Sequence, residues 1–86
     1  MAKSFAVKLV GPEGVLAEAE VESLVLPGAA GSLGVLAGHE PWTVLLKKGA
    51  VSFKRSGGNW ENVEIASGVA SIEPAKTIIL ADKAGQ

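Results

Sequence analysis

The chain has 86 residues, which is enough for one domain with a single hydrophobic core and too few for a second. Its formal net charge of −1 gives no electrostatic reason to expect binding to nucleic acid or to an anionic lipid surface. The absence of cysteine excludes disulfides and thiolate metal sites, and the single histidine excludes a histidine-based metal cluster. Although 48% of the residues are hydrophobic, no apolar run approaches the roughly 18 residues of a membrane span. The sequence therefore predicts one soluble, intracellular domain over residues 1–86, with any membrane association made through another protein.

Apolar and polar residues alternate along most of the chain, which is the pattern of half-buried β-strands. The first strand is predicted over residues 5–9, with its odd-numbered apolar residues buried. After a turn, the alternation resumes over residues 17–22 and places three glutamates on the exposed face. The phase breaks at Ser23, because Leu24 and Leu26 take the alternate positions that the glutamates held before. Such a one-residue change requires a β-bulge or a crossing to another sheet, so one of these is predicted here.

A segment rich in glycine and proline, residues 27–41, separates this region from the rest of the chain. Its Pro-Gly start is expected to end a strand, and its last four residues are expected to form a tight corner. The segment therefore predicts a compact, shaped loop that presents His39 at one end of a rigid β domain. A positive φ is expected at Gly34, so that a Gly34→Val substitution should disturb the loop. No nucleophile, metal-ligand cluster or phosphate-binding pattern accompanies it, and contact with a partner is predicted rather than chemistry.

Further short strands are predicted beyond this loop, with turn signals between them. They cover residues 42–46, 51–54, 61–65, 69–72 and 77–81. Apolar residues do not recur at helical spacing over three turns anywhere in the chain. Short strands with frequent turns are typical of sandwiches and barrels. The predicted fold is all-β, a flattened sandwich or barrel of about eight to ten short antiparallel strands in two sheets.

Several side chains each have two interpretations. His39 is either a partner contact or a loop histidine whose ring caps a turn carbonyl. Trp42 is either an interface anchor or a half-buried core residue. Trp60 is expected either to be exposed at the end of a hairpin or to cover the edge of the sandwich. Three alternating glutamates form either an acidic stripe that binds a basic partner or simply a solvated strand face: Glu18, Glu20 and Glu22.

The sequence resembles the ε subunit of rotary F-type ATP synthases, called δ in mitochondria, in its N-terminal β-sandwich domain. The most specific stretch is Gly31–Pro41, which matches the family pattern G-x-L-G-[VI]-L-x-G-H-x-P. Three residues depart from the family: Ser32 stands where an acidic residue is frequent, Ala37 replaces a frequent proline, and Trp42 replaces a leucine-like residue. Other matches are the turn Val10-Gly11-Pro12-Glu13-Gly14, the turn Lys48-Gly49 and the closing Ile79-Leu80-Ala81-Asp82. The helical hairpin that follows the domain in many family members is expected to be absent.

The resemblance implies a non-catalytic central-stalk subunit, without a cofactor, in the rotor of an F1Fo ATP synthase. Such a subunit links the γ subunit to the c-ring and carries the torque that couples proton transport to ATP synthesis. It implies a peripheral position on the cytoplasmic side of the energy-transducing inner membrane, held there only through the complex, with no nucleic-acid partner. Contacts with γ or the c-ring are expected from Gly31, Ser32, Leu33, His39, Glu40 and Trp42.

Without the hairpin, neither inhibition of ATP hydrolysis nor ATP sensing is expected. The alternative function is a stand-alone β-sandwich module that binds a different protein.

Overall fold

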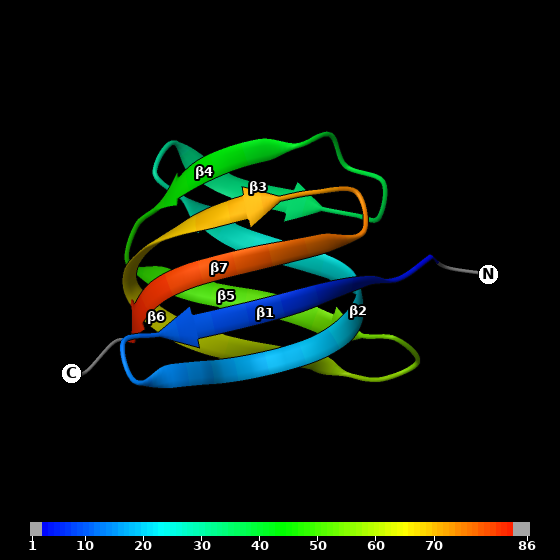
Figure 1. The fold of residues 1–86 in the computed structure, drawn as a ribbon, viewed down its shortest axis with the longest axis horizontal. Coiled ribbons are helices and arrows are strands. Elements are labelled where there is room, and N and C mark those ends of the chain that lie inside the picture. Colours follow the sequence, from blue (N-terminus) through cyan, green and yellow to red (C-terminus); the bar gives the residue numbers. More distant parts are fainter. Residues whose placement is uncertain (1–2, 84–86) are drawn as a thin grey trace.

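A computed structural model describes residues 3–83, and this part of the chain folds into strands without any helix (Figure 1). The all-β fold class is therefore confirmed. The seven strands are β1 (Phe5–Gly11), β2 (Gly14–Gly28), β3 (Gly31–Val35), β4 (Trp42–Leu46), β5 (Gly49–Arg55), β6 (Trp60–Ile72) and β7 (Lys76–Lys83).

Five of the strands close into a flattened barrel, because each is hydrogen-bonded to the next around a ring. The ring runs β1–β7–β6–β5–β2 and returns to β1. Strand β4 extends the ring along β6, and β3 extends it along β2. Closure satisfies the backbone donors and acceptors of the ring without leaving an open sheet edge there. One pairing, between β1 and β7, is parallel, so the prediction of a wholly antiparallel arrangement is wrong at this point.

Two long strands, β2 and β6, each take part in both layers of the sandwich. In Figure 1, β2 runs along the lower edge of the front layer, bends at the right and continues behind, whereas β6 bends at the left. Each bend coincides with an extra residue in the strand. The register of β2 against β5 shifts between Val21 and Ser23, and that of β6 against β7 shifts between Ile65 and Ser67. An extra residue bends a strand and restores the inward phase of its apolar side chains.

The β2 shift confirms the bulge predicted at Ser23, since Val21 and Leu24 are both buried on either side of it. By contrast, the break expected at residues 66–68 is a second bulge within a continuous strand. Strand continuity through both bulges is the reason that the described chain has seven strands rather than the eight to ten predicted.

One hydrophobic core fills the space between the two layers. The odd-numbered side chains of β1 point into it as predicted, with Leu9 completely buried. The core is built from all seven strands and contains Phe5, Val7, Leu9, Val21, Leu24, Leu26, Val35, Leu46, Val51, Phe53, Ile65, Ala70, Ile72, Ile79 and Ala81. Aliphatic and aromatic side chains packed at crystal-like density give such a small body a shape that resists deformation.

Candidate functional site

About half of the segment predicted to be a loop, residues 27–41, forms β-strand. Residues 31–35 form β3, which pairs with the end of β2 from Leu24↔Val35 to Gly28↔Gly31. Only residues 36–41 form an irregular connection to β4. Gly34 lies inside β3, without the positive φ predicted for it, and a Cβ built there meets no atom within 4 Å. The predicted disturbance by Gly34→Val therefore loses its basis.

The tip of the β2–β3 hairpin carries three of the predicted contact residues. Gly31 has a φ of 137°, which favours glycine, and it closes the turn opposite Gly28. Ser32 is exposed beside it. Leu33 points inward instead and packs against the core. Of the three predicted residues at this tip, Gly31 and Ser32 are therefore the ones that a partner can reach.

The corner between β3 and β4 carries the other three predicted residues. The imidazole of His39 stacks on Trp42 with ring centroids 6.1 Å apart and an interplanar angle of 12°. Its Nδ1 lies 2.7 Å from the carbonyl oxygen of Glu40, to which it donates when it carries the proton. The ring thus caps a turn carbonyl, as the second interpretation of His39 predicted. Trp42 pairs with the buried Ile72 but remains 55% exposed, so it lies at the rim of the core rather than in it.

The hairpin tip and the His39 corner lie at opposite ends of β4. The tip lies near the end of β4, where Gly28 pairs with Leu46. The corner leads into the start of β4, and Gly38 donates from its backbone N–H to the carbonyl of Pro74. Four residue steps of a strand separate the two ends by about 13 Å. The single platform expected from the sequence is thus two separate surfaces, which appear at the left and the right of the upper part of Figure 1.

A third surface could not be predicted from the sequence, because it depends on the register of four pairs of neighbouring strands. One row of directly paired residues crosses β4, β6, β7, β1 and β2 on the outer face of that layer, and every member is apolar. Its members are Leu45, Val69, Leu80, Val10 and Val15, here called the apolar row. Leu45 is 65% exposed, Leu80 58% and Val15 53%. Only the register of the strands, which local alternation does not specify, places these residues side by side.

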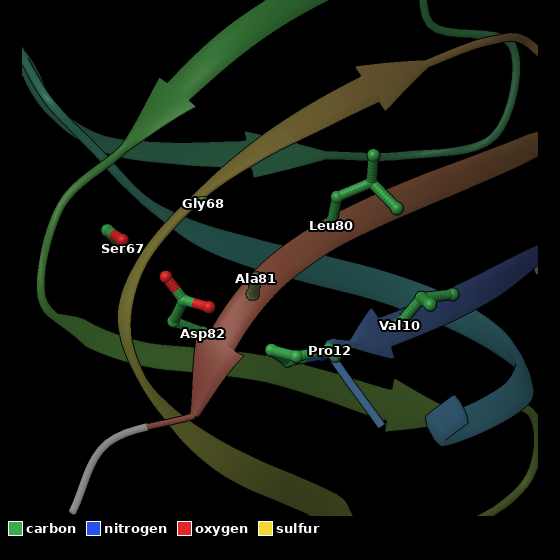
Figure 2. A pocket seen from close by; sticks show the side chains of 8 residues that line it. Val10, Pro12, Ser67, Gly68, Leu80, Ala81 and Asp82 are labelled. Carbon is green, nitrogen blue, oxygen red and sulfur yellow. The ribbon is translucent and has the colours of Figure 1, made fainter. Parts of the chain in front are cut away.

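Beside the apolar row lies a hollow of about 290 Å³ between the ends of β1 and β7 and the bulged middle of β6. Figure 2 shows Leu80 and Val10 on one side of it, and Asp82 together with Ser67 and Pro12 on the other. Gly68 and Ala81 also line it. A second hollow of about 450 Å³ adjoins it and shares Pro12 and Asp82 with it.

Two ion pairs lie away from these surfaces, around the β5–β6 hairpin. Lys54 Nζ is 2.6 Å from Glu22 Oε1, and this hydrogen bond, with one from the backbone of Gly57, lowers the pKa of the Glu22 carboxyl. Arg55 binds Glu61, which lowers the pKa of that carboxyl and raises the pKa of the guanidinium. Glu22 thus belongs to a structural ion pair, and of the predicted acidic stripe only Glu18 and Glu20 remain fully exposed.

Within residues 3–83, no group of three or more His, Asp or Glu side chains could hold a metal ion. The same residues contain no helix with the length and hydropathy needed to cross a membrane.

Comparison with known proteins places this barrel in a family. Residues 4–86 match the family model described as the ATP synthase delta/epsilon chain, beta-sandwich domain. The chain is 40% identical to the ATP synthase epsilon chain of Mesorhizobium japonicum and 38% identical to that of Brucella canis, each over 84 residues. These alignments cover 98% of this chain and 62% of each relative, so the chain spans less than two thirds of the length of these relatives.

Solved structures share the fold. A chain in the mitochondrial ATP synthase of Euglena gracilis, resolved as OSCP/F1/c-ring, superposes with a TM-score of 0.84 at 22% identity, over 91% of this chain and 50% of that one. A chain in the central stalk/c-ring structure from Tetrahymena thermophila gives 0.75 at 14% identity, over 94% and 65%. Given the family match over nearly its whole length, this chain belongs to the family of the β-sandwich domain of ATP synthase delta and epsilon chains.

Proposed function

We propose that this chain is a non-catalytic central-stalk subunit of an F1Fo ATP synthase, where it links the γ subunit to the c-ring. The observation that carries the proposal is the family match over residues 4–86, which includes every strand of the closed barrel. In addition, the two relatives reported above are epsilon chains, and the two solved structures reported above are ATP synthase structures described as containing a c-ring.

A closed and densely packed barrel suits a part that must transmit torque. Its strands are tied to one another around the ring, so a force applied at one surface reaches another without a hinge between them. In this role the domain turns with γ and the c-ring, and it helps couple proton transport to ATP synthesis without taking part in the chemistry. It lies on the cytoplasmic side of the membrane and is attached only through the complex.

The predicted contact residues divide between two surfaces in this proposal. The hairpin tip contributes Gly31 and Ser32, with Leu33 holding the tip against the core. The corner contributes His39 and Trp42 as a stacked pair next to the exposed Glu40. Because these surfaces lie at opposite ends of β4, one chain contacts two different parts of the rotor through them.

The direct test is binding to the purified γ subunit of the same organism, measured by isothermal titration calorimetry. We expect a one-to-one complex with a Kd in the micromolar range or tighter, about −8 kcal/mol or more in binding free energy. Circular dichroism first establishes that the chain is folded. A folded chain that fails to bind γ at micromolar concentrations contradicts the proposal.

Two variants then assign the two surfaces. Ser32→Arg places a long charged side chain on the hairpin tip, and Trp42→Ala removes the stacked ring of the corner. Each is compared with the unmodified chain for binding to γ alone and for retention on a purified γ–c-ring assembly. A variant that weakens only the second interaction marks its surface as the one that faces the c-ring.

A further inference from the structure

Strand β3 is an open edge of the sheet. Every strand of the closed ring has a hydrogen-bonded neighbour on both sides. Within residues 3–83, β3 pairs with β2 and with no other strand. In Figure 1 it lies in the upper part of the molecule, behind β4. The backbone groups along its far side are therefore free to pair with a further strand.

The backbone groups that face this free edge belong to Ser32 and Gly34. The carbonyl oxygen of Pro27 accepts a hydrogen bond of 2.9 Å from the backbone N–H of Lys47, so Pro27 directs its carbonyl away from β3. Pro27 lies opposite Ser32, and Val25 lies opposite Gly34. Because hydrogen-bonded and non-hydrogen-bonded pairs alternate along an antiparallel ladder, both of these pairs are of the second kind. Ser32 and Gly34 therefore direct their N–H and C=O groups outward.

The edge of β3 lacks the features that usually prevent strand addition. Natural proteins protect open edges with charged side chains, prolines or β-bulges. Residues 23–39 contain no Asp, Glu, Lys or Arg, and β3 itself contains no proline. Its register against β2 runs without a shift, and both Ser32 and Gly34 are exposed. Nothing along the described part of this edge therefore opposes a second strand.

The edge of β4 that faces away from β6 is different. There the carbonyl oxygen of Leu45 already accepts a hydrogen bond of 2.9 Å from the backbone N–H of Ala29. Two charged residues, Lys47 and Lys48, follow directly after the strand. This edge is thus partly occupied and flanked by charge, which leaves β3 as the better site for strand addition.

The free edge of β3 is complementary to itself. When two copies of β3 lie antiparallel with Leu33 opposite Leu33, Ser32 of each copy faces Gly34 of the other. The residues with outward backbone groups then meet as hydrogen-bonded pairs, in which each pair exchanges both N–H···O bonds. Each such pair sets a small side chain opposite a glycine, so no side chains collide. The two Leu33 side chains, only partly buried in one copy, meet across the twofold axis.

We propose that β3 is a self-association edge, at which two copies of this chain pair antiparallel through β3 with Leu33 on the twofold axis. The sheet then continues from one chain into the other, which is the strand-addition mode of recognition. The pairing is independent of the proposed function. One consequence rests on that function: pairing covers Ser32, so the hairpin tip is presented to the rotor only by the monomer.

The first test measures the oligomeric state of the purified chain by analytical ultracentrifugation. Because the interface is small, we expect a reversible dimer with a Kd between about 10 μM and 1 mM. Gly34→Pro removes an outward N–H without removing a hydrogen bond to β2, and it is expected to raise the Kd at least about tenfold. The matched control Gly34→Ala keeps that N–H and is expected to stay within about twofold of the unmodified chain.

A second variant covers the case in which Gly34→Pro does not fold, which circular dichroism reveals. Gly34→Lys keeps the backbone N–H but places a charge on the outward face of β3, where a built Cβ meets no atom within 4 Å. In the dimer the two added lysines lie near the twofold axis and repel each other, so we expect a monomer at low salt.

Single cysteines test the register, since the chain has no cysteine of its own. Leu33 lies opposite itself in a non-hydrogen-bonded pair, where Cα atoms are about 4.5 Å apart and a disulfide fits. Ser32 and its counterpart are diagonal neighbours about 7–8 Å apart, which is too far. We expect Leu33→Cys to form a disulfide-linked dimer at least about tenfold faster than Ser32→Cys on mild oxidation. Random collision predicts the reverse, because Ser32 is the more exposed of the two.

The opposite results overturn the inference. An unmodified, folded chain that stays monomeric up to about 1 mM shows that β3 does not pair with a second copy. A dimer that the folded Gly34 variants leave intact assigns self-association to another surface. Cross-linking of Ser32→Cys as fast as Leu33→Cys contradicts the register. None of these experiments contains γ, so their failure leaves the proposed function standing, and failure to bind γ leaves the dimer standing.

Discussion

At the scale of single residues, the β2–β3 hairpin requires a glycine at a position where a side chain would not fit. The requirement is steric and does not come from a positive φ. A Cβ on Gly28 would lie 2.6 Å from the carbonyl oxygen of Gly31, a backbone atom that cannot move aside without opening the turn. The hairpin tip proposed as a contact surface is therefore possible only because residue 28 has no side chain.

We expect Gly28→Ala to lower the free energy of unfolding by about 1–3 kcal/mol, the usual cost of overpacking a tight site. Gly34→Ala is the matched control in the same hairpin, since its Cβ meets nothing within 4 Å. That substitution is expected to leave stability unchanged or to raise it by up to about 1 kcal/mol. Urea denaturation of both variants measures the difference, and equal effects would contradict this account of the turn.

The Glu22–Lys54 pair gives stability a dependence on pH. The hydrogen bond from Lys54 lowers the folded-state pKa of the Glu22 carboxyl below its ordinary value of 4.5. A group with a lowered folded pKa stabilises the fold above its unfolded pKa and loses that contribution as the pH falls through the folded value.

We therefore expect Glu22→Gln to lower the urea midpoint at pH 7 relative to the unmodified chain, and to lower it much less at pH 3. Denaturation curves at the two pH values provide the measurement. Glu13→Gln, at an exposed position in the β1–β2 turn, serves as the control. An effect of Glu22→Gln that is as large at pH 3 as at pH 7 would show that the charge of Glu22 is not involved.

At the scale of elements, the bulge in β2 decides which side chains reach the core. Before it the buried residue is Val21, and after it the buried residues are Leu24 and Leu26, at even positions. The extra residue, Glu22, is held by Lys54 of β5 and by the backbone of Gly57. The ion pair thus lies at the place where β2 passes from one layer to the other.

The inward position of Leu24 after the bulge predicts a much larger effect of a leucine-to-alanine substitution there than at an outward position such as Leu45 in β4. Leu24 is 1% exposed and Leu45 is 65% exposed. We expect Leu24→Ala to cost about 2–5 kcal/mol of unfolding free energy, as truncation in a core does. Leu45→Ala is expected to change it by no more than about 0.5 kcal/mol. Chemical denaturation distinguishes them, and a small effect of Leu24→Ala would mean that β2 is out of phase with this structure.

At the scale of the whole molecule, the barrel has one core to which all seven strands contribute, and its first and last strands pair directly with each other. Neither layer can therefore separate from the other without exposing the core. A small domain organised in this way unfolds in a single cooperative transition.

The two tryptophans test this cooperativity from different parts of the barrel. Trp42 lies at the start of β4 and Trp60 at the start of β6, beside β5, and both are more than half exposed, so neither is needed for the core. We expect the single-tryptophan variants Trp60→Phe and Trp42→Phe to give urea unfolding curves with coincident midpoints by fluorescence. Separate midpoints would reveal layers that unfold independently.

The sequence by itself determined the all-β class, the buried face of β1, the bulge near Ser23 and the exposed position of Trp60. These follow from local alternation, in which a residue's neighbours in the chain decide the direction of its side chain. It also carried the family motif in Gly31–Pro41, which depends only on order and spacing.

Only the tertiary structure decided how those local elements meet. It divided the predicted contact segment into the hairpin tip and the His39 corner, since β3 and β4 lie between them. It joined Leu45, Leu80 and Val15 into one row, although they are far apart in the chain. Alternation gives a side chain its direction, but it does not specify which strand lies alongside or at what register. Those choices are made by long-range pairing and core packing, and they create the surfaces that a partner meets.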